Sequence, residues 1–320
     1  MSQSVFLTGA SGFVGRAVLR RLLAEGANVT APVRDGSKVL EPGVQTVQFG
    51  AFDSTNWLEN LAGVDAVVHC AARVHVMNDA ETDPLAAFRK VNVQGTLNLA
   101  EQAAQAGVRR FVFISSIKVN GEGTQPGRPY TAQDVPAPSD PYGISKLEAE
   151  QGLLALAART RMEVVIIRPV LVYGPGVKAN FFNMMRWLEK GVPLPFGAIN
   201  NSRSLVALDN LVDLIIRSID HPGAANQVFL VSDGEDLSTT QLLRKTAVAL
   251  GKSARLLPVP GWMLSTAANL LGKKSLSQRL CGSLQVDINK TTTLLQWSPP
   301  VSVDNALKSV AAQYMSDKKQ

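Results

Sequence analysis

The chain has 320 residues, of which 46% are hydrophobic and 18% charged, a composition ordinary for a folded globular protein. This length accommodates one large domain together with a smaller one. The formal net charge is only +6, and no block of like charges precedes the final Lys318-Lys319. We interpret the excess as a solubility feature and expect no nucleic-acid partner, although a mildly positive field also suits an anionic substrate.

The two cysteines, Cys70 and Cys281, lie far apart in the sequence and lack metal-ligand spacing. They therefore predict neither a disulfide framework nor a metal site. The first apolar run begins at Ser4, which leaves no room for a signal peptide. The most apolar late stretch, from Trp262 to Leu271, is too short to span a bilayer. We expect a cytoplasmic protein without stable membrane insertion.

Through the first two thirds of the chain, apolar runs of strand length alternate with helical patterns. The expected strands cover residues 4–8, 28–33, 46–49, 66–70, 111–115 and 164–168. The expected helices cover residues 14–24, 85–106 and 142–158. Such alternation predicts an α/β fold, namely a Rossmann-type doubly wound parallel sheet with helices on both faces.

The pattern changes after Tyr173, where Gly174-Pro175-Gly176 interrupts it. The expected elements are then helices near 180–190, 209–219, 239–250 and 303–314, a strand at 227–231, and an irregular stretch at 191–203. We expect residues 1–173 to form a dinucleotide-binding domain and residues 174–320 a smaller α/β substrate-binding domain. The second would cover the carboxyl edge of the sheet, and residues 209–231 could return to the first.

A glycine-rich turn joins the first expected strand to the first expected helix. Glycine allows a tight turn and a close approach of the backbone to a pyrophosphate, and the helix N-terminus offers free amides. The spacing is G-x-x-G-x-x-G rather than the dehydrogenase fingerprint G-x-G-x-x-G. The predicted dinucleotide-binding residues of this turn are Gly9, Ser11, Gly12, Phe13, Val14 and Gly15.

The end of the second strand indicates the type of cofactor. Arg34 stands where an acidic residue would bind the ribose of NAD, and an arginine suits the 2′-phosphate of NADP. We therefore favour NADP(H), while Asp35, one residue later, leaves NAD(H) open. Asp53, just after the third strand, is placed to meet an adenine amino group, or alternatively to cap a helix.

The candidate chemistry depends on three residues in the later part of this domain. Ser116 closes the fifth strand, and Tyr142 and Lys146, four residues apart, share one face of a helix. A lysine ammonium beside a phenol stabilises the phenolate and is expected to lower the tyrosine pKa. Such a phenol can act as a general acid or base on a sugar hydroxyl or ketone, with the serine holding the same oxygen. These three are the predicted catalytic residues.

Taken together, these motifs resemble the extended short-chain dehydrogenases/reductases, in particular the NAD-dependent epimerase/dehydratase family that acts on nucleotide-sugars. The resemblance covers nearly the whole chain. The segments that carry it are Thr8-Gly9-Ala10-Ser11-Gly12-Phe13-Val14-Gly15, His69-Cys70-Ala71-Ala72, Asn92-Val93-Gln94-Gly95-Thr96, Ser115-Ser116, Tyr142-Gly143-Ile144-Ser145-Lys146, and Arg168-Pro169-Val170-Leu171-Val172-Tyr173-Gly174-Pro175.

For the cofactor, the resemblance implies that Ala71 and Ala72 pass beneath it, that Asn92 supports the active-site backbone and that Pro169 lies beside the nicotinamide. For the substrate, it implies that Asn180 and Phe181 form the turn that holds the nucleoside diphosphate.

Three further residues are expected near the substrate. Arg203 resembles the family's arginine on the diphosphate, where a guanidinium makes a two-pronged phosphate donor. We also place Lys118 among the substrate-binding candidates. His75 could face the sugar, or it could be an ordinary loop residue.

The chain departs from the family pattern after Ser116. Dehydratases of the family carry Asp-Glu there as acid and base, whereas this chain has Ile117-Lys118, so dehydration is disfavoured. Asn120 replaces the usual tyrosine of the next turn without a function that the sequence explains. Leu171 stands where epimerases commonly have asparagine, which weakens the match to UDP-galactose epimerases.

The remaining reactions are reduction and epimerisation, and we place reduction slightly ahead because Arg34 favours NADPH. Resemblance to bacterial O-antigen and polysaccharide enzymes implies a reductase of a UDP-4-keto-6-deoxy-N-acetylhexosamine that makes UDP-N-acetylquinovosamine. The alternative is a UDP-glucose or UDP-N-acetylglucosamine 4-epimerase with tightly bound NAD. A reductase of a small lipophilic ketone and a non-catalytic cofactor sensor also remain open. The family further implies a homodimer, for which helices 85–106 and 142–158 are candidates.

Overall fold

The computed structural model describes residues 3–34, 41–74, 83–177, 180–270, 272 and 274–318. Within them, seven parallel strands form one sheet in the order β3-β2-β1-β4-β5-β6-β9. Their bounds are β1 Ser4–Thr8, β2 Asn28–Val33, β3 Gln45–Gln48, β4 Ala66–His69, β5 Arg110–Ile114, β6 Glu163–Pro169 and β9 Gln227–Val231. The predicted Rossmann-type parallel sheet is confirmed.

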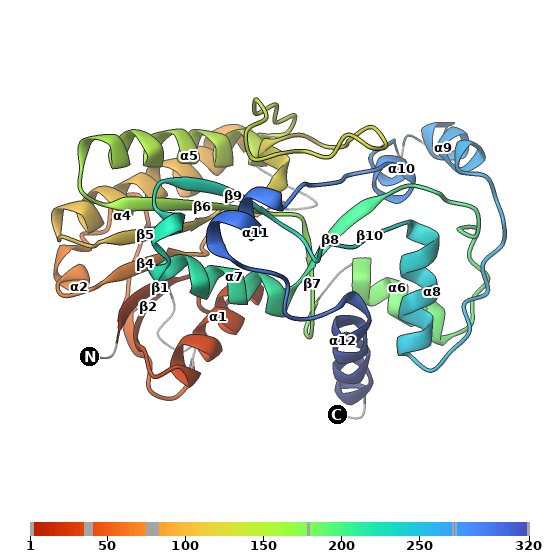
Figure 1. The fold of residues 1–320 in the computed structure, drawn as a ribbon, viewed down its shortest axis with the longest axis horizontal. Helices are drawn as coiled ribbons and strands as arrows, with labels where there is room; N and C mark the ends of the chain where they lie inside the picture. The colour runs from red at the N-terminus through yellow and green to blue at the C-terminus, as the bar shows by residue number, and fades with distance from the viewer. Residues whose placement is uncertain are drawn as a thin grey trace.

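Helices cover both faces of this sheet (Figure 1). One face packs against α1 (Phe13–Ala24), α7 (Leu208–Asp220) and α11 (Asn289–Leu295). The other packs against α2 (Leu58–Leu61), α4 (Gly95–Gln105) and α5 (Pro141–Arg159). The central strands β1, β4 and β5 are almost fully buried because both faces are covered, which is why they appear in the sequence as continuous apolar runs.

The helix expected at 85–106 is interrupted. It consists of α3 (Pro84–Arg89), a π-helical segment η1 (Lys90–Gln94) and α4. A π-helical turn adds one residue to the helix, and such turns concentrate at functional sites. Asn92 lies in this segment and is buried. Periodicity could not reveal the interruption, because hydrophobic spacing barely changes over a single turn.

Beyond the main sheet lies a smaller lobe, on the right in Figure 1. It holds a second sheet of three strands in the order β10-β8-β7. Strand β8 (Arg203–Ala207) runs parallel to β7 (Leu171–Tyr173) and antiparallel to β10 (Asp236–Leu237). The lobe also contains α6 (Asn180–Glu189), α8 (Thr239–Ala249), α9 (Gly261–Leu270), α10 (Lys274–Cys281) and α12 (Val303–Asp317).

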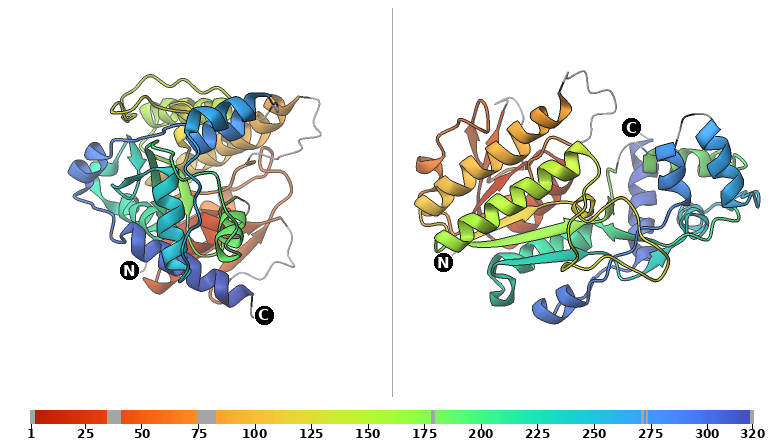
Figure 2. Two further views of the ribbon diagram at one scale, coloured as in Figure 1. Left: turned by 90° about the vertical axis from the view of Figure 1, so that its right-hand side faces the viewer. Right: turned by 90° about the horizontal axis from the view of Figure 1, so that it is seen from above.

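The two lobes are joined along the carboxyl edge of the main sheet. Figure 2 shows the main sheet and its helices at one end of the molecule and α9 and α10 at the other. A 3-10 turn, η2 (Ile117–Val119), follows β5 at this edge, and a second, η3 (Pro222–Ala224), follows α7 at the opposite edge. None of the helices in the described ranges is long and apolar enough to cross a membrane.

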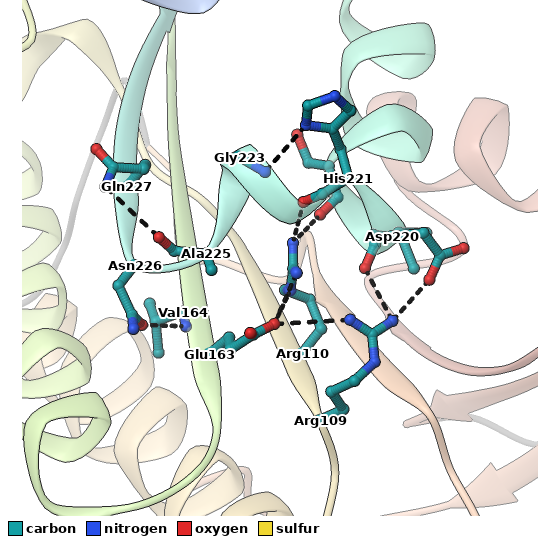
Figure 3. Close-up of polar contacts among 12 residues, drawn as sticks. Arg109, Arg110, Glu163, Val164, Asp220, His221, Gly223, Ala225, Asn226 and Gln227 are labelled. Carbon is teal, nitrogen blue, oxygen red and sulfur yellow. Dashed lines mark hydrogen bonds and ion pairs between the residues drawn. The ribbon is translucent and has the colours of Figure 1, made fainter. Parts of the chain in front are cut away.

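The amino edge of the sheet is held by a buried guanidinium (Figure 3). Arg110, at the start of β5, is 1% exposed. Its Nε and Nη2 donate to Glu163 Oε2 at 2.9 and 2.6 Å, and its Nη1 donates to the carbonyls of Ser218 and His221 at 2.8 and 3.2 Å. One side chain therefore fastens β5, β6 and the end of α7.

Replacing Arg110 with methionine should destabilise the protein by about 3 kcal/mol, because the carboxylate and two carbonyls lose their donor at once. Denaturation by urea measures this. The neighbouring Arg109 is the matched control, since it is half exposed, pairs with the exposed Asp220 and lies farther from Glu163, at 3.6 Å. Arg109→Met should change the unfolding free energy little. Equal losses in the two variants would contradict the structural role assigned to Arg110.

Candidate active site

The glycine-rich turn packs tightly at the carboxyl end of β1. Gly9 has φ +71°, and a Cβ there would lie 2.7 Å from the Ala71 nitrogen. A Cβ on Gly15 would lie 2.1 Å from the Gly9 carbonyl oxygen. Gly12 is the N-cap of α1, and no side chain caps the helix. The turn thus needs glycine and presents a helix N-terminus whose amides have no capping side chain, which fits a dinucleotide pyrophosphate.

A buried histidine aligns this turn with the next strand. His69 Nδ1 lies 2.8 Å from Thr8 Oγ1, and its Nε2 lies 3.0 Å from Thr96 Oγ1. Burial, together with the Lys146 charge, lowers the pKa of His69 to about 3. The Ala71 amide donates to the same Thr8 oxygen at 3.2 Å. A permanently neutral imidazole therefore holds the segment of Ala71 and Ala72 against the glycine turn.

The adenosine end of the predicted site is only partly described. Arg34 is exposed at the carboxyl end of β2. Asp53 Oδ2 lies 4.0 Å from Lys90 Nζ. Asp35 and His75 fall outside the described residues.

The three predicted catalytic residues converge at the carboxyl edge. Ser116 lies just beyond β5, and Tyr142 and Lys146 lie in the first turns of α5. The Tyr142 hydroxyl is hydrogen-bonded to the Ser116 side chain. Lys146 Nζ donates to the Ile114 carbonyl at 2.8 Å and lies 4.3 Å from the centre of the Phe113 ring.

The charge states of this group differ from the expectation. Burial, followed by the Asp140 carboxylate, raises the pKa of Tyr142 to about 12, although the Ser116 hydrogen bond opposes the rise. The prediction that Lys146 lowers the pKa of Tyr142 is therefore wrong for the protein by itself. The reason is geometric, since the ammonium donates to a backbone carbonyl. Burial lowers the pKa of Lys146 to about 8, and the charges of Glu150 and Cys70 act in the other direction.

A buried ion pair that sequence reasoning missed lies one turn beyond Lys146. Glu150 and Arg168 are both almost fully buried, and Arg168 donates to both Glu150 oxygens at 2.5 to 3.2 Å. Ser115 Oγ donates to the same carboxylate. Arg168 Nη1 donates to Asn120 Oδ1 at 2.9 Å, which gives Asn120 a partner and an explanation. The spacing Tyr142, Lys146, Glu150 on one helix face was the available signal.

Asn92 connects α5 to the segment after β4. Its Oδ1 accepts from the Arg73 amide at 2.8 Å, and its Nδ2 donates to the Arg73 carbonyl and to Ser145 Oγ, both at 3.0 Å. Ser145 in turn donates to the Tyr142 carbonyl at 2.8 Å. Pro169 lies at the end of β6, on the same edge of the sheet.

The predicted diphosphate residues lie in the smaller lobe. Arg203, at the start of β8, donates to the Gly282 carbonyl at 3.1 Å. Burial and the nearby Arg279 lower the pKa of Arg203. Two neighbouring guanidiniums form an electropositive position suited to a diphosphate, and sequence reasoning missed Arg279. The Phe181 ring stacks on Tyr173 at 5.7 Å in the core of the lobe, so only its backbone is free for a ligand. The Asn180 side chain lies outside the described part of the structure.

Lys118 is ion-paired within the protein. Its Nζ pairs with Asp140 and lies 3.0 Å from Glu122 Oε1. The adjacent Ile117 is buried and apolar. Neither residue after Ser116 can therefore serve as the carboxylic acid and base that dehydration needs.

Comparison with known proteins identifies the class. The model of the NAD dependent epimerase/dehydratase family matches residues 5–232. The chain belongs to this family and is an NAD(P)-dependent enzyme of the group that contains nucleotide-sugar epimerases, dehydratases and reductases.

Several known proteins are similar to this chain over most of its length. A UDP-glucose 4-epimerase of Vibrio cholerae is 50% identical over 322 residues, covering 98% of this chain and 96% of that protein. An N-acetyl-alpha-D-glucosaminyl-diphospho-ditrans,octacis-undecaprenol 4-epimerase of Escherichia coli O157:H7 is 29% identical, covering 91% and 89%. The crystal structure of a UDP-glucose 4-epimerase of Thermotoga maritima with UDP-glucose has the same fold, with a TM-score of 0.79 and 23% identity over 99% and 100% of the chains.

Replacing Gly9 with alanine should abolish dinucleotide binding, because the new methyl would collide with the Ala71 backbone and force the turn open. Gly26 is the matched control, since it also has positive φ but has nothing within 4 Å. Gly26→Ala should lose about 1 kcal/mol of stability from backbone strain alone. Gly9→Ala should lose more, because the collision adds to that strain. Fluorescence titration with NAD then separates them. Unchanged affinity in the Gly9 variant would show that this turn does not bind the cofactor.

Replacing Glu150 with glutamine should destabilise the protein by about 3 kcal/mol, because it leaves the Arg168 charge buried without a counter-charge. It should also lower the pKa of Lys146 further, since the Glu150 carboxylate acts to raise it. Denaturation and a pH titration of activity measure the two effects. Glu101→Gln, at an exposed pair with Arg159, is the control and should change neither.

Proposed function

We propose that this enzyme is a UDP-sugar 4-epimerase that interconverts UDP-glucose and its C4 epimer with retained NAD. The observation that carries the proposal is the 50% identity over nearly the full length to a UDP-glucose 4-epimerase. This relationship outweighs Arg34, an exposed residue, on which the preference for an NADPH-dependent reductase depended.

The site supports hydride chemistry at a sugar carbon that bears a hydroxyl. The uncapped N-terminus of α1 and the glycine turn would hold the pyrophosphate, with Ala71 beside the turn. A bound nicotinamide would supply a reversible hydride acceptor for the sugar carbon. Tyr142 takes the proton from the sugar hydroxyl and gives it back, and Ser116 donates to the same oxygen.

Bound ligands would change the electrostatics of the site in two ways. Arg203 and Arg279 lie together on the smaller lobe, where a diphosphate would relieve their mutual repulsion. A positive charge on the oxidised nicotinamide would oppose the effects that raise the Tyr142 pKa. Catalysis thus depends on the filled site rather than on the protein alone.

The wild-type protein should convert UDP-glucose to UDP-galactose without added cofactor, as measured by chromatography of the nucleotide-sugars. Tyr142→Phe should lower kcat at least about 100-fold, because the general acid and base is lost. Tyr314→Phe is the matched control, since Tyr314 lies on α12 in the core of the smaller lobe and donates to Glu189. Full activity of the Tyr142 variant would reject the mechanism.

Reduction of a UDP-4-keto-6-deoxy sugar is the second candidate, and the exposed Arg34 at the end of β2 is the feature that favours it. The absorbance of NADPH distinguishes the two. Rapid NADPH oxidation with the keto sugar, together with no interconversion of C4 epimers, would replace the epimerase proposal. NAD that copurifies with the protein would support the epimerase proposal.

A further inference from the structure

Lys118 contacts the two segments that carry the predicted catalytic hydroxyls. Its amide donates to Ser116 Oγ at 3.2 Å. Its carbonyl oxygen packs against the start of α5, where a Cβ on Gly143 would lie 2.9 Å away. Its side chain is only about a quarter exposed. The residue therefore contacts both the turn that holds Ser116 and the helix that holds Tyr142.

Its principal partner, Asp140, has two roles. Asp140 is the N-cap of α5, and its Oδ1 accepts from the Gly143 amide at 2.7 Å. Its other oxygen pairs with Lys118 Nζ. Asp140 is also the charged neighbour that raises the pKa of Tyr142, two residues later. A carboxylate that caps the catalytic helix thus opposes ionisation of the catalytic phenol.

The charged groups of the elements packed around Tyr142 come from α5, from η2 and from α3. Asp140 caps α5, and Lys146 and Glu148 lie on it. From η2 and the loop after it come Lys118 and Glu122. From α3 comes Arg89, which pairs with Glu148. The apolar Phe88 of α3 packs against Tyr142 with a ring separation of 6.0 Å, and the Arg73 guanidinium lies 5.7 Å from the centre of the Phe88 ring. Since Lys146 donates to Ile114, Lys118 is the cation paired directly with Asp140.

We propose that Lys118 is a positioning residue of the active site: its ammonium holds the Asp140 carboxylate at the cap of α5 and neutralises that carboxylate beside the Tyr142 hydroxyl. The inference rests on the proposed function, in which Tyr142 exchanges the proton. It replaces the expectation that Lys118 binds the substrate. It also explains how this chain uses a position where dehydratases of the family place an acid or a base.

The first test is Lys118→Met, which keeps the length of the side chain and removes its charge. The unpaired Asp140 carboxylate would disfavour the phenolate, so the rising limb of the kcat profile should move about one pH unit upward. Activity at pH 7 should fall roughly 10-fold and recover at higher pH. KM for the nucleotide-sugar should stay within a factor of about two, since the proposal gives Lys118 no substrate contact.

The second test is Asp140→Asn, which keeps an N-cap residue of the same shape. Removing the negative charge should move the same limb downward, the direction opposite to that of Lys118→Met. The double variant should return toward the wild-type profile, because neither charge remains. A purely structural pair predicts no such reversal of sign.

Two controls test whether the effect of Lys118→Met comes from the lost charge at this position. The first addresses the shape of the side chain, and the second addresses the loss of an ion pair elsewhere. Lys118→Arg keeps the positive charge and should keep the wild-type profile. Lys245→Met removes a lysine that bridges Asp304 and Glu235 in the smaller lobe and should shift nothing.

The ionisation of Tyr142 should also be followed by ultraviolet difference absorbance of the NAD-loaded protein, with Tyr142→Phe as reference, since this readout needs no turnover. If Lys118→Met raises the phenol pKa in a protein that epimerises no nucleotide-sugar, the proposed function fails and the role of Lys118 stands. If the enzyme is active and Lys118→Met raises KM with an unchanged pH profile and phenol pKa, Lys118 binds the substrate and the inference is overturned.

Discussion

The Lys146 ammonium is buried between α5 and β5, a position that costs free energy unless the charge is compensated. The protein compensates it with the Ile114 carbonyl, the face of Phe113 and the negative charge of Glu150 one turn away. Glu150 is itself buried and depends on Arg168. The position of one buried cation, a predicted catalytic residue, therefore determines a chain of buried polar groups from α5 to β6.

This arrangement explains why a parallel sheet suits the chemistry. The carboxyl ends of β1, β4, β5 and β6 meet at one edge, so the glycine turn, Ala71, Ser116 and Pro169 become neighbours although they are far apart in sequence. Helix α5 then crosses this edge with Tyr142 and Lys146 on the face toward β5. The buried Arg110 holds the opposite edge of the sheet, away from these residues.

Without ligands, the electrostatics of the site favour the uncharged forms of Tyr142 and Lys146. The chain's own groups raise the pKa of Tyr142 and lower that of Lys146. Both shifts disfavour charge at this predicted catalytic pair, as burial does in general. In the proposed mechanism, a bound dinucleotide and diphosphate would change that balance, so that proton transfer would depend on binding.

The sequence by itself determined the strand and helix pattern of the main sheet, the glycine turn and the Ser116, Tyr142 and Lys146 set, because each depends on local spacing and on residue type. Strand 4–8 was predicted at its observed bounds, for example, since both of its faces are buried and its central residues are apolar. Only the tertiary structure decided the π-helical turn around Asn92, strand β8, the Glu150–Arg168 pair, the position of Arg279 near Arg203, and the direction in which the pKa of Tyr142 shifts. These depend on which distant side chains meet and on how much water they exclude, and one-dimensional spacing contains neither quantity.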